Sequence, residues 1–157
     1  MITVRRAQAG DGAILHAMVR ALAEDHKLTQ YLTSTPQDLE AALFQSHAVV
    51  DALIALADGE PAGCAIWHRS FSTFRGRDAF YLEDLSVLPQ FRRRGIARAL
   101  MRELSCIAVA AGAISIYWVM MDWNASGRAL YEGLGAEIEP GINFCRLTGP
   151  ALERLAT

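Results

Sequence analysis

The segment Pro89-Gln-Phe-Arg92-Arg93-Arg94-Gly95-Ile96-Ala97 decides the fold of this chain. It follows an apolar run that is typical of a strand and opens a helical pattern. Backbone N–H groups at the start of a helix point out of the turn, and the helix dipole adds partial positive charge there. Gly95 and Ala97 are small enough to let an anion approach the backbone, and the arginines add charge-assisted contacts. The segment predicts a phosphate-binding junction, with an ordinary turn and solvated arginines as the alternative.

The rest of the sequence argues against several other chemistries. It contains no G-x-x-x-x-G-K-[ST] loop, no G-x-G-x-x-G fingerprint and no G-x-S-x-G elbow, so P-loop, Rossmann and hydrolase readings lack support. The three cysteines, Cys64, Cys106 and Cys145, form no C-x-x-C pair, so we expect no metal site. Reduced thiols and the lack of a signal-peptide pattern favour a cytoplasmic location.

Length and charge are those of a soluble globular domain. The chain has 157 residues, 52% of them hydrophobic, and we expect a single domain over residues 1–157. The net charge is −2, so no overall basic field favours nucleic acid. The apolar stretches are too short or too charged to cross a membrane, so neither nucleic acid nor a membrane is an expected partner.

Hydrophobic periodicity and turn signals predict alternating strands and helices. Asp58-Gly59 is a hairpin signal, and Thr35-Pro36 with Asp38 is a helix N-terminus. We expect an α/β chain of the α+β type, with a mixed sheet and helices on both faces. The run at 113–121 is so apolar that we expect it to be buried on both sides. The expected strands are 2–6, 48–56, 62–69, 78–88, 113–121, 136–139 and 142–148, and the expected helices are 11–25, one from 35, 95–111, 126–134 and a last turn at 151–156.

Arg92-Arg-Arg-Gly95-Ile-Ala97 matches R-x-x-G-x-[GA], the pyrophosphate loop of the GNAT acetyltransferases. The later stretch Ser126-Gly-Arg-Ala-Leu-Tyr131-Glu-Gly-Leu-Gly135-Ala also resembles that family, and so does the order of elements. The resemblance implies a mostly antiparallel, twisted sheet of about six to seven strands, splayed between the fourth and fifth. It also implies acetyl-CoA as cosubstrate and direct attack by an amine in a ternary complex.

A narrower resemblance points to the branch that acetylates spermidine, spermine and thialysine. Tyr81-Leu-Glu83-Asp84-Leu and the later Trp123-Asn124 with Leu130-Tyr131 carry it. The resemblance implies that Glu83 contacts the amine and that Tyr131 is the proton donor. Homodimers are common in this branch, so a homodimer is expected.

The family also implies which residues hold acetyl-CoA. Its pantetheine arm lies along an open strand edge, like an added strand, and an asparagine after the next strand bonds the arm. Asn124 matches that asparagine, although an N-cap for the following helix is its structural reading. The residues implied in cosubstrate binding are Leu85, Ser86, Val87, Arg92, Arg93, Arg94, Gly95, Ile96, Ala97, Arg98, Asn124, Ser126 and Tyr131.

Two adjacent carboxylates accompany the expected acceptor site. Neighbouring side chains of a strand point to opposite faces, so only one of Glu83 and Asp84 should face the cleft. The family match favours Glu83 as the base, with Asp84 on the other face or steering cations. Hydrogen-bonded structural carboxylates are the alternative for both. His68 is a weaker candidate, late in its strand and able to face the cleft.

The acceptor stays open at this point. Three arginines between Arg69 and Arg77 would repel a polyamine and would suit an amine that also carries a carboxylate. The region Gly141-Ile-Asn143-Phe lacks the tryptophan of the polyamine branch. A small-molecule amine is the expected acceptor and partner. A protein lysine or N-terminus, or a module that only binds acetyl-CoA, are the alternatives.

Overall fold

The structure, a computed structural model, describes residues 1–156 in two compact units. The first is Met1–Trp118, and the second begins at Val119. The first unit holds a five-stranded sheet in the order β1-β2-β3-β4-β5. Its strands are β1 (Ile2–Arg6), β2 (Asp51–Ala57), β3 (Glu60–Ser72), β4 (Arg77–Val87) and β5 (Ile116–Tyr117). The first three pairings are antiparallel, and β5 joins β4 in parallel.

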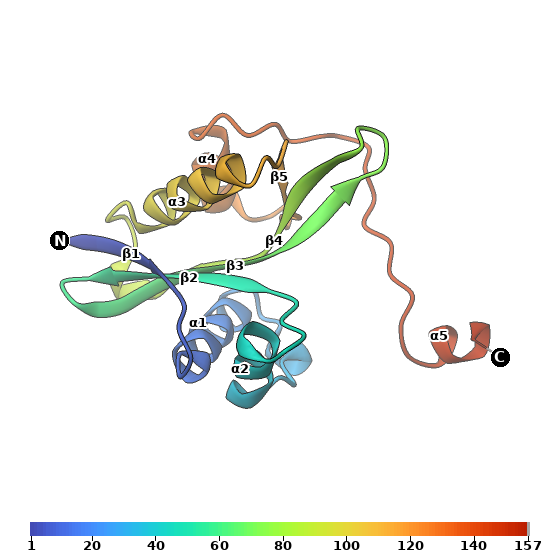
Figure 1. Ribbon diagram of the computed structural model, residues 1–157, viewed down its shortest axis with the longest axis horizontal. Helices are drawn as coiled ribbons and strands as arrows, with labels where there is room; N and C mark the ends of the chain where they lie inside the picture. The colour runs from blue at the N-terminus through green and yellow to red at the C-terminus, as the bar shows by residue number, and fades with distance from the viewer. Residues whose placement is uncertain (157) are drawn as a thin grey trace. The chain divides into compact units, whose positions relative to one another are not determined.

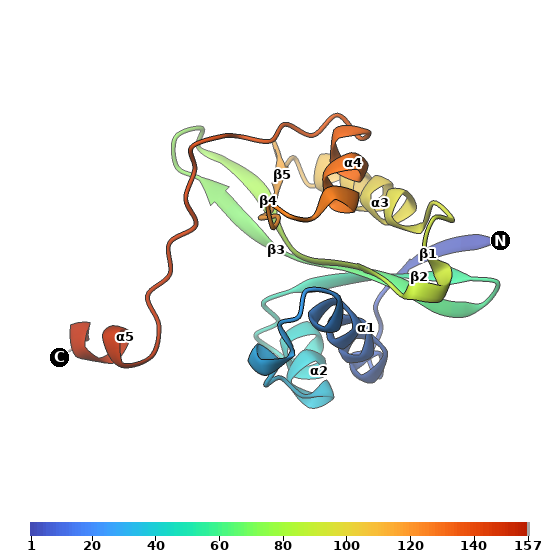
Figure 2. The same ribbon diagram turned by 180° about the vertical axis from the view of Figure 1, so that it is seen from behind.

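Helices cover both faces of this sheet (Figures 1 and 2). One face carries α1 (Gly12–Asp25) and α2 (Pro36–Phe44), and the other carries α3 (Ile96–Ala110). Short 3₁₀ turns, η1 (Thr29–Tyr31) and η2 (Pro89–Phe91), precede α2 and α3. The core beneath α1 and α2 is one buried cluster of Leu15, Met18, Leu43, Ala52, Ile54, Cys64 and Ile66. The expected class, a mixed α/β sheet with helices on both faces, is confirmed.

Local signals placed most of the first unit correctly. Thr35 and Asp38 form the reciprocal capping box that opens α2, and Pro36 is its first residue. Asp58 and Gly59 both have positive φ, 54° and 89°, as the tight turn between β2 and β3 requires. The expected loop at 70–77 is wrong, because β3 and β4 run on through Ser72 and Arg77 and leave only a short turn between them.

The expectation of six to seven strands is also wrong. Only Ile116 and Tyr117 of the apolar run 113–121 form a strand, and Tyr117 and Val119 are 45% and 59% exposed. Within residues 1–156 no strand follows β5, and the expected strands at 136–139 and 142–148 are absent. A strand needs a neighbouring edge to complete its hydrogen bonds, and an apolar sequence pattern does not supply one. Helices α4 (Ala125–Glu132) and α5 (Gly149–Leu155) are the elements of the second unit.

The pairing of β4 with β5 is short, and this leaves an open edge. Phe80 pairs with Ile116 and Tyr81 with Tyr117. Among the described residues, no strand pairs with that edge of β4 beyond Tyr81, so its backbone from Leu82 to Val87 is left open on that side. An extended chain of amides can bond to such an edge.

Candidate active site

A β-bulge at Glu83 sets the geometry of the acceptor side of the site. In the ladder between β3 and β4, Trp67 lies opposite Leu82, and Ile66 lies opposite Asp84. Glu83 is therefore the extra residue, with no partner of its own in β3. A bulge of this kind interrupts the alternation of side chains along a strand.

The bulge brings both carboxylates to one face of the sheet. Asp84 lies opposite Ile66, which belongs to the cluster beneath α1 and α2. Opposite residues in a ladder share a face, so Asp84 lies on the α1 side. Glu83 Oε1 lies 3.4 Å from Nε2 of His68, which is two residues from Ile66 and shares its face. The expectation that Glu83 and Asp84 point to opposite faces is therefore wrong.

A row of three aromatic side chains begins beside Glu83. The His68 ring lies 5.3 Å from Tyr81, and Tyr81 lies 5.2 Å from Tyr117, measured between ring centroids. Burial raises the pKa of Tyr81, and the nearby Glu83 carboxylate raises it further. The Tyr117 hydroxyl shares a 2.6 Å hydrogen bond with Ser70 Oγ. Glu83 itself is about half exposed, at 49%, so an acceptor can reach it from solvent.

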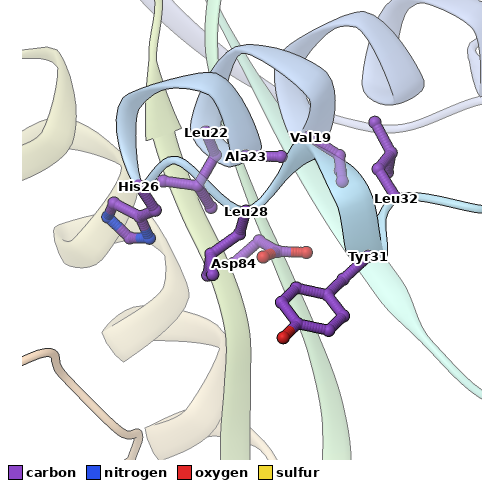
Figure 3. A pocket seen from close by; sticks show the side chains of 8 residues that line it. All are labelled: Val19, Leu22, Ala23, His26, Leu28, Tyr31, Leu32 and Asp84. Atoms are coloured by element: carbon purple, nitrogen blue, oxygen red, sulfur yellow. The ribbon is translucent and has the colours of Figure 1, made fainter.

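Asp84 faces a small, mainly apolar pocket of about 210 Å³ (Figure 3). Its other lining residues come from α1 and the segment that follows it: Val19, Leu22, Ala23, His26, Leu28, Tyr31 and Leu32. Burial raises the pKa of Asp84 to about 6, and the Glu83 carboxylate adds to that shift. A carboxyl with such a pKa exchanges its proton close to neutral pH, which suits proton transfer.

The phosphate-binding junction has the backbone geometry expected of an anion site. Arg93 and Gly95 both adopt positive φ, 61° and 84°, and Gly95 is the N-cap of α3. Alternating turns of this kind direct successive N–H groups into one concavity, and the first N–H groups of a helix have no partner within it. A negatively charged phosphate fits this exposed junction.

The arginines of the junction are less available to bind an anion than the sequence implied. Arg92 forms an ion pair with Asp25, and its Nε donates a 3.0 Å hydrogen bond to the carbonyl of Val87. Arg94 pairs with Asp58 at 2.6 Å. These two side chains therefore hold the loop against α1 and the β2–β3 turn, and backbone N–H groups remain as the main anion donors.

Two expected cosubstrate residues, Ser86 and Ile96, can act only through their backbones. Ser86 is buried, and its hydroxyl donates a 2.9 Å bond to the carbonyl of Met18. Ile96 is 1% exposed and packs in the core. Leu85 and Val87 lie on the open stretch of β4, while Ala97 and Arg98 form the first turn of α3.

Asn124, Ser126 and Tyr131 belong to the second unit. The Asn124 side chain caps α4, because Oδ1 accepts bonds from the Gly127 N–H at 2.9 Å and the Ser126 hydroxyl at 3.1 Å. Tyr131 lies on α4, and burial raises the pKa of its phenol. Asn124 is thus the N-cap of α4, which was the structural alternative to a bond with the pantetheine arm.

The structure weakens the argument that the three arginines between Arg69 and Arg77 would repel a polyamine. Arg75 and Arg77 lie at the turn between β3 and β4. Glu83 lies six positions after Arg77 in an extended strand, which corresponds to about 20 Å. Arg69 approaches Asp78 at 3.8 Å, which offsets its charge. These side chains do not set the charge around Glu83.

Sequence reasoning missed the cluster of His68, Tyr81 and Tyr117 around Glu83. His68 was only a weak candidate, because the side on which it lies depends on the ladder with β4. The one available signal was its spacing of two residues from Ile66. Among residues 1–156, no group of three or more His, Cys, Asp or Glu side chains could hold a metal, and none of the helices there is long and apolar enough to cross a bilayer.

The sequence model of the acetyltransferase (GNAT) family matches residues 15–136. The chain belongs to the GNAT acetyltransferase family. This GNAT enzyme is 31% identical to the thialysine N-epsilon-acetyltransferase of Bos taurus, over 99% of this chain and 97% of the relative. It is 34% identical to that of Caenorhabditis elegans, over 90% and 89%. The L-ornithine N5-acetyltransferase of Arabidopsis thaliana is 31% identical over 64% of this chain and 44% of its own.

Solved structures agree on the fold of this GNAT protein. An integron cassette protein of V. cholerae superposes with a TM-score of 0.81 at 23% identity, over 99% of this chain and 97% of that one. An aminoglycoside acetyltransferase from a soil metagenome superposes with a TM-score of 0.77 at 24% identity, over 94% and 99%. These likenesses support the fold alone.

The Asp84→Asn variant should be more stable than the wild type at neutral pH. The raised pKa of Asp84 means that the folded state binds a proton more tightly than the unfolded chain. The contribution of this carboxyl to the free energy of unfolding therefore falls as pH rises from about 4 to about 6. Removing the charge should raise the free energy of unfolding by about 1–3 kcal/mol at about pH 7 and change it little at about pH 4. Urea unfolding at both pH values measures this. Asp51→Asn, an exposed acid in a surface pair, is the control, and an equal change in both variants would contradict the assignment.

Proposed function

We propose that this GNAT enzyme transfers an acetyl group from acetyl-CoA to the primary amine of a small molecule, within one domain over residues 1–157. The observation that carries the proposal is the bulge that brings Glu83 and Asp84 to one face, beside the pocket and the open edge of β4. The family match supports the single domain, because residues 15–136 span both units.

The carboxylates serve the acceptor. An alkylammonium with a pKa of about 10.4 has no lone pair and must lose a proton before it can attack. The exposed Glu83 carboxylate binds the ammonium and accepts that proton. Asp84, at the wall of the pocket, adds negative charge where the acceptor enters.

The chain holds acetyl-CoA with backbone groups. The N–H groups of Arg93 to Arg98 face the pyrophosphate at the start of α3. The open edge from Leu85 to Val87 bonds the amides of the arm, with Asn124 and Ser126 as further contacts. Bound acetyl-CoA supplies the thioester that the amine attacks directly in a ternary complex.

Tyr131 holds the second proton of the reaction at its phenol oxygen. Because burial raises the pKa of this phenol, it stays protonated at neutral pH. A phenol at or above about 10 can protonate a departing thiolate, whose acid lies near about 8.5. We assign Tyr131 as the proton donor to the leaving sulfur.

An amino-acid-like amine is the acceptor class that the names of the similar proteins favour. Asp25, one of the acids that a polycationic acceptor would need, is already paired with Arg92. The similar proteins from cattle and Arabidopsis are named for thialysine and ornithine, amines that also carry a carboxylate. Polyamines are the second candidate class, because two acids face the cleft. A protein acceptor stays the alternative, and a homodimer and a cytoplasmic location stay predictions.

A thiol-release assay with acetyl-CoA tests the proposal. The acceptor panel should contain lysine analogues, ornithine, spermidine, unrelated amino acids and a lysine peptide. We expect the highest kcat/KM with the lysine analogues or ornithine. Turnover of the peptide alone would replace the small-molecule assignment with a protein acceptor, and no turnover of any amine would refute the proposal.

Gly95→Glu should weaken acetyl-CoA binding by about tenfold or more, because it places negative charge where the pyrophosphate lies. Gly112→Glu is a matched control. It lies at the other end of α3 with φ of 74°, and like Gly95 it has open space around an added Cβ. Calorimetry should show normal affinity for the control only. Equal affinity in both variants would show that the junction does not hold the pyrophosphate.

Tyr131→Phe should lower kcat by about 10²-fold or more while acetyl-CoA affinity changes little. The substitution removes only the donating hydroxyl and keeps the ring. Steady-state kinetics together with calorimetry separate the two effects. An unchanged kcat would remove Tyr131 as the proton donor.

A further inference from the structure

The His68 imidazole lies in direct contact with the proposed base, Glu83. Its Nε2 lies 3.4 Å from Oε1 of Glu83, and its Nδ1 lies 2.9 Å from the backbone carbonyl of Arg69. A carbonyl oxygen can only accept a hydrogen bond, so Nδ1 carries the proton of that bond. The atom that faces Glu83 is therefore the basic nitrogen of the neutral ring.

This tautomer makes the pair a site for one further proton. A neutral Nε2 and a carboxylate oxygen both present lone pairs, and they attract each other only when a proton lies between them. A proton delivered to Glu83 thus has an acceptor already in place. Imidazole nitrogens are, as a class, more basic than carboxylate oxygens.

Other titratable side chains share this face of the sheet with the pair. On the same face lie Asp84, the Tyr81 ring at 5.3 Å and, beyond it, Tyr117. His26 and Tyr31 lie with Asp84 around the pocket. Arg69 and Asp78 pair with Phe80 and Phe71 in the ladder, which places them on the opposite face. The His68 side chain is 35% exposed, so it can release a proton to water.

We propose that Glu83 transfers the proton of the substrate amine to His68, and that His68 releases it to solvent. The inference rests on the proposed function. The ammonium N–H bond breaks as Glu83 takes the proton, and the amine keeps the electron pair with which it attacks. The Glu83 O–H bond then breaks as Nε2 of His68 takes the proton, and the imidazolium releases it to water. His68 acts through Glu83 and does not touch the acceptor.

Substitution with chemical rescue tests this relay. His68→Ala should lower kcat/KM for the acceptor by about tenfold or more, with unchanged acetyl-CoA affinity. Added imidazole should restore much of the loss, because it supplies the missing base. His47→Ala removes an exposed histidine outside the site and is the matched control, with full activity and no response to imidazole.

A second variant separates proton transfer from positioning. His68→Gln keeps a polar group beside Glu83 but cannot accept a proton. It should stay as slow as His68→Ala. Full activity of His68→Gln, or no rescue of His68→Ala by imidazole, would overturn the relay while the acetyltransferase function stands. A wild type that acetylates no amine would instead refute the proposed function.

The tautomer can be measured without turnover. Nitrogen-15 NMR of the histidine rings should show His68 with its proton on Nδ1 in the neutral form. A proton on Nε2 would overturn the relay, because that nitrogen could not then accept from Glu83.

Discussion

The ladder between β3 and β4 is the constraint on which the site depends. Over this stretch β4 has one residue more than β3, and this extra residue, Glu83, is accommodated between Leu82 and Asp84. The resulting bulge places two carboxylates on the α1 side of the sheet, where a regular strand would present one. Burial raises the pKa of Asp84, the nearby Glu83 carboxylate adds to that shift, and Glu83 lies beside His68. The acid–base chemistry proposed for the acceptor side thus depends on one irregularity in strand pairing.

The second constraint lies at the other end of β4. Positive φ angles at Arg93 and Gly95 turn the chain sharply into α3, and the ion pairs of Arg92 and Arg94 hold that turn against neighbouring elements. The same strand therefore carries in its middle the carboxylates proposed to meet the acceptor, and it leads into the proposed anion site beyond its end. An open backbone edge runs between the two, because β5 pairs with only Phe80 and Tyr81.

Local rules predicted the elements that depend on nearby residues. The capping box of Thr35 and Asp38 and the turn at Asp58-Gly59 were predictable because each is formed within a few residues. The strand at 113–121 was not, since its hydrophobicity says nothing about which edge it meets. The prediction that Glu83 and Asp84 point to opposite faces failed for a related reason. Alternation of side chains assumes a regular ladder, and the bulge is a property of the pairing between β3 and β4.

The sequence by itself determined the family, because the motif from Arg92 to Ala97 lies within one short segment. The resemblance to that family then implied the phosphate-binding junction and the roles proposed for Glu83 and Tyr131. Only the tertiary structure decided that Glu83 and Asp84 share a face, that Arg92 and Arg94 are already paired, and that His68 meets Glu83. Each of these depends on the register between strands or on contacts between residues far apart in the chain, which no local pattern of residues encodes.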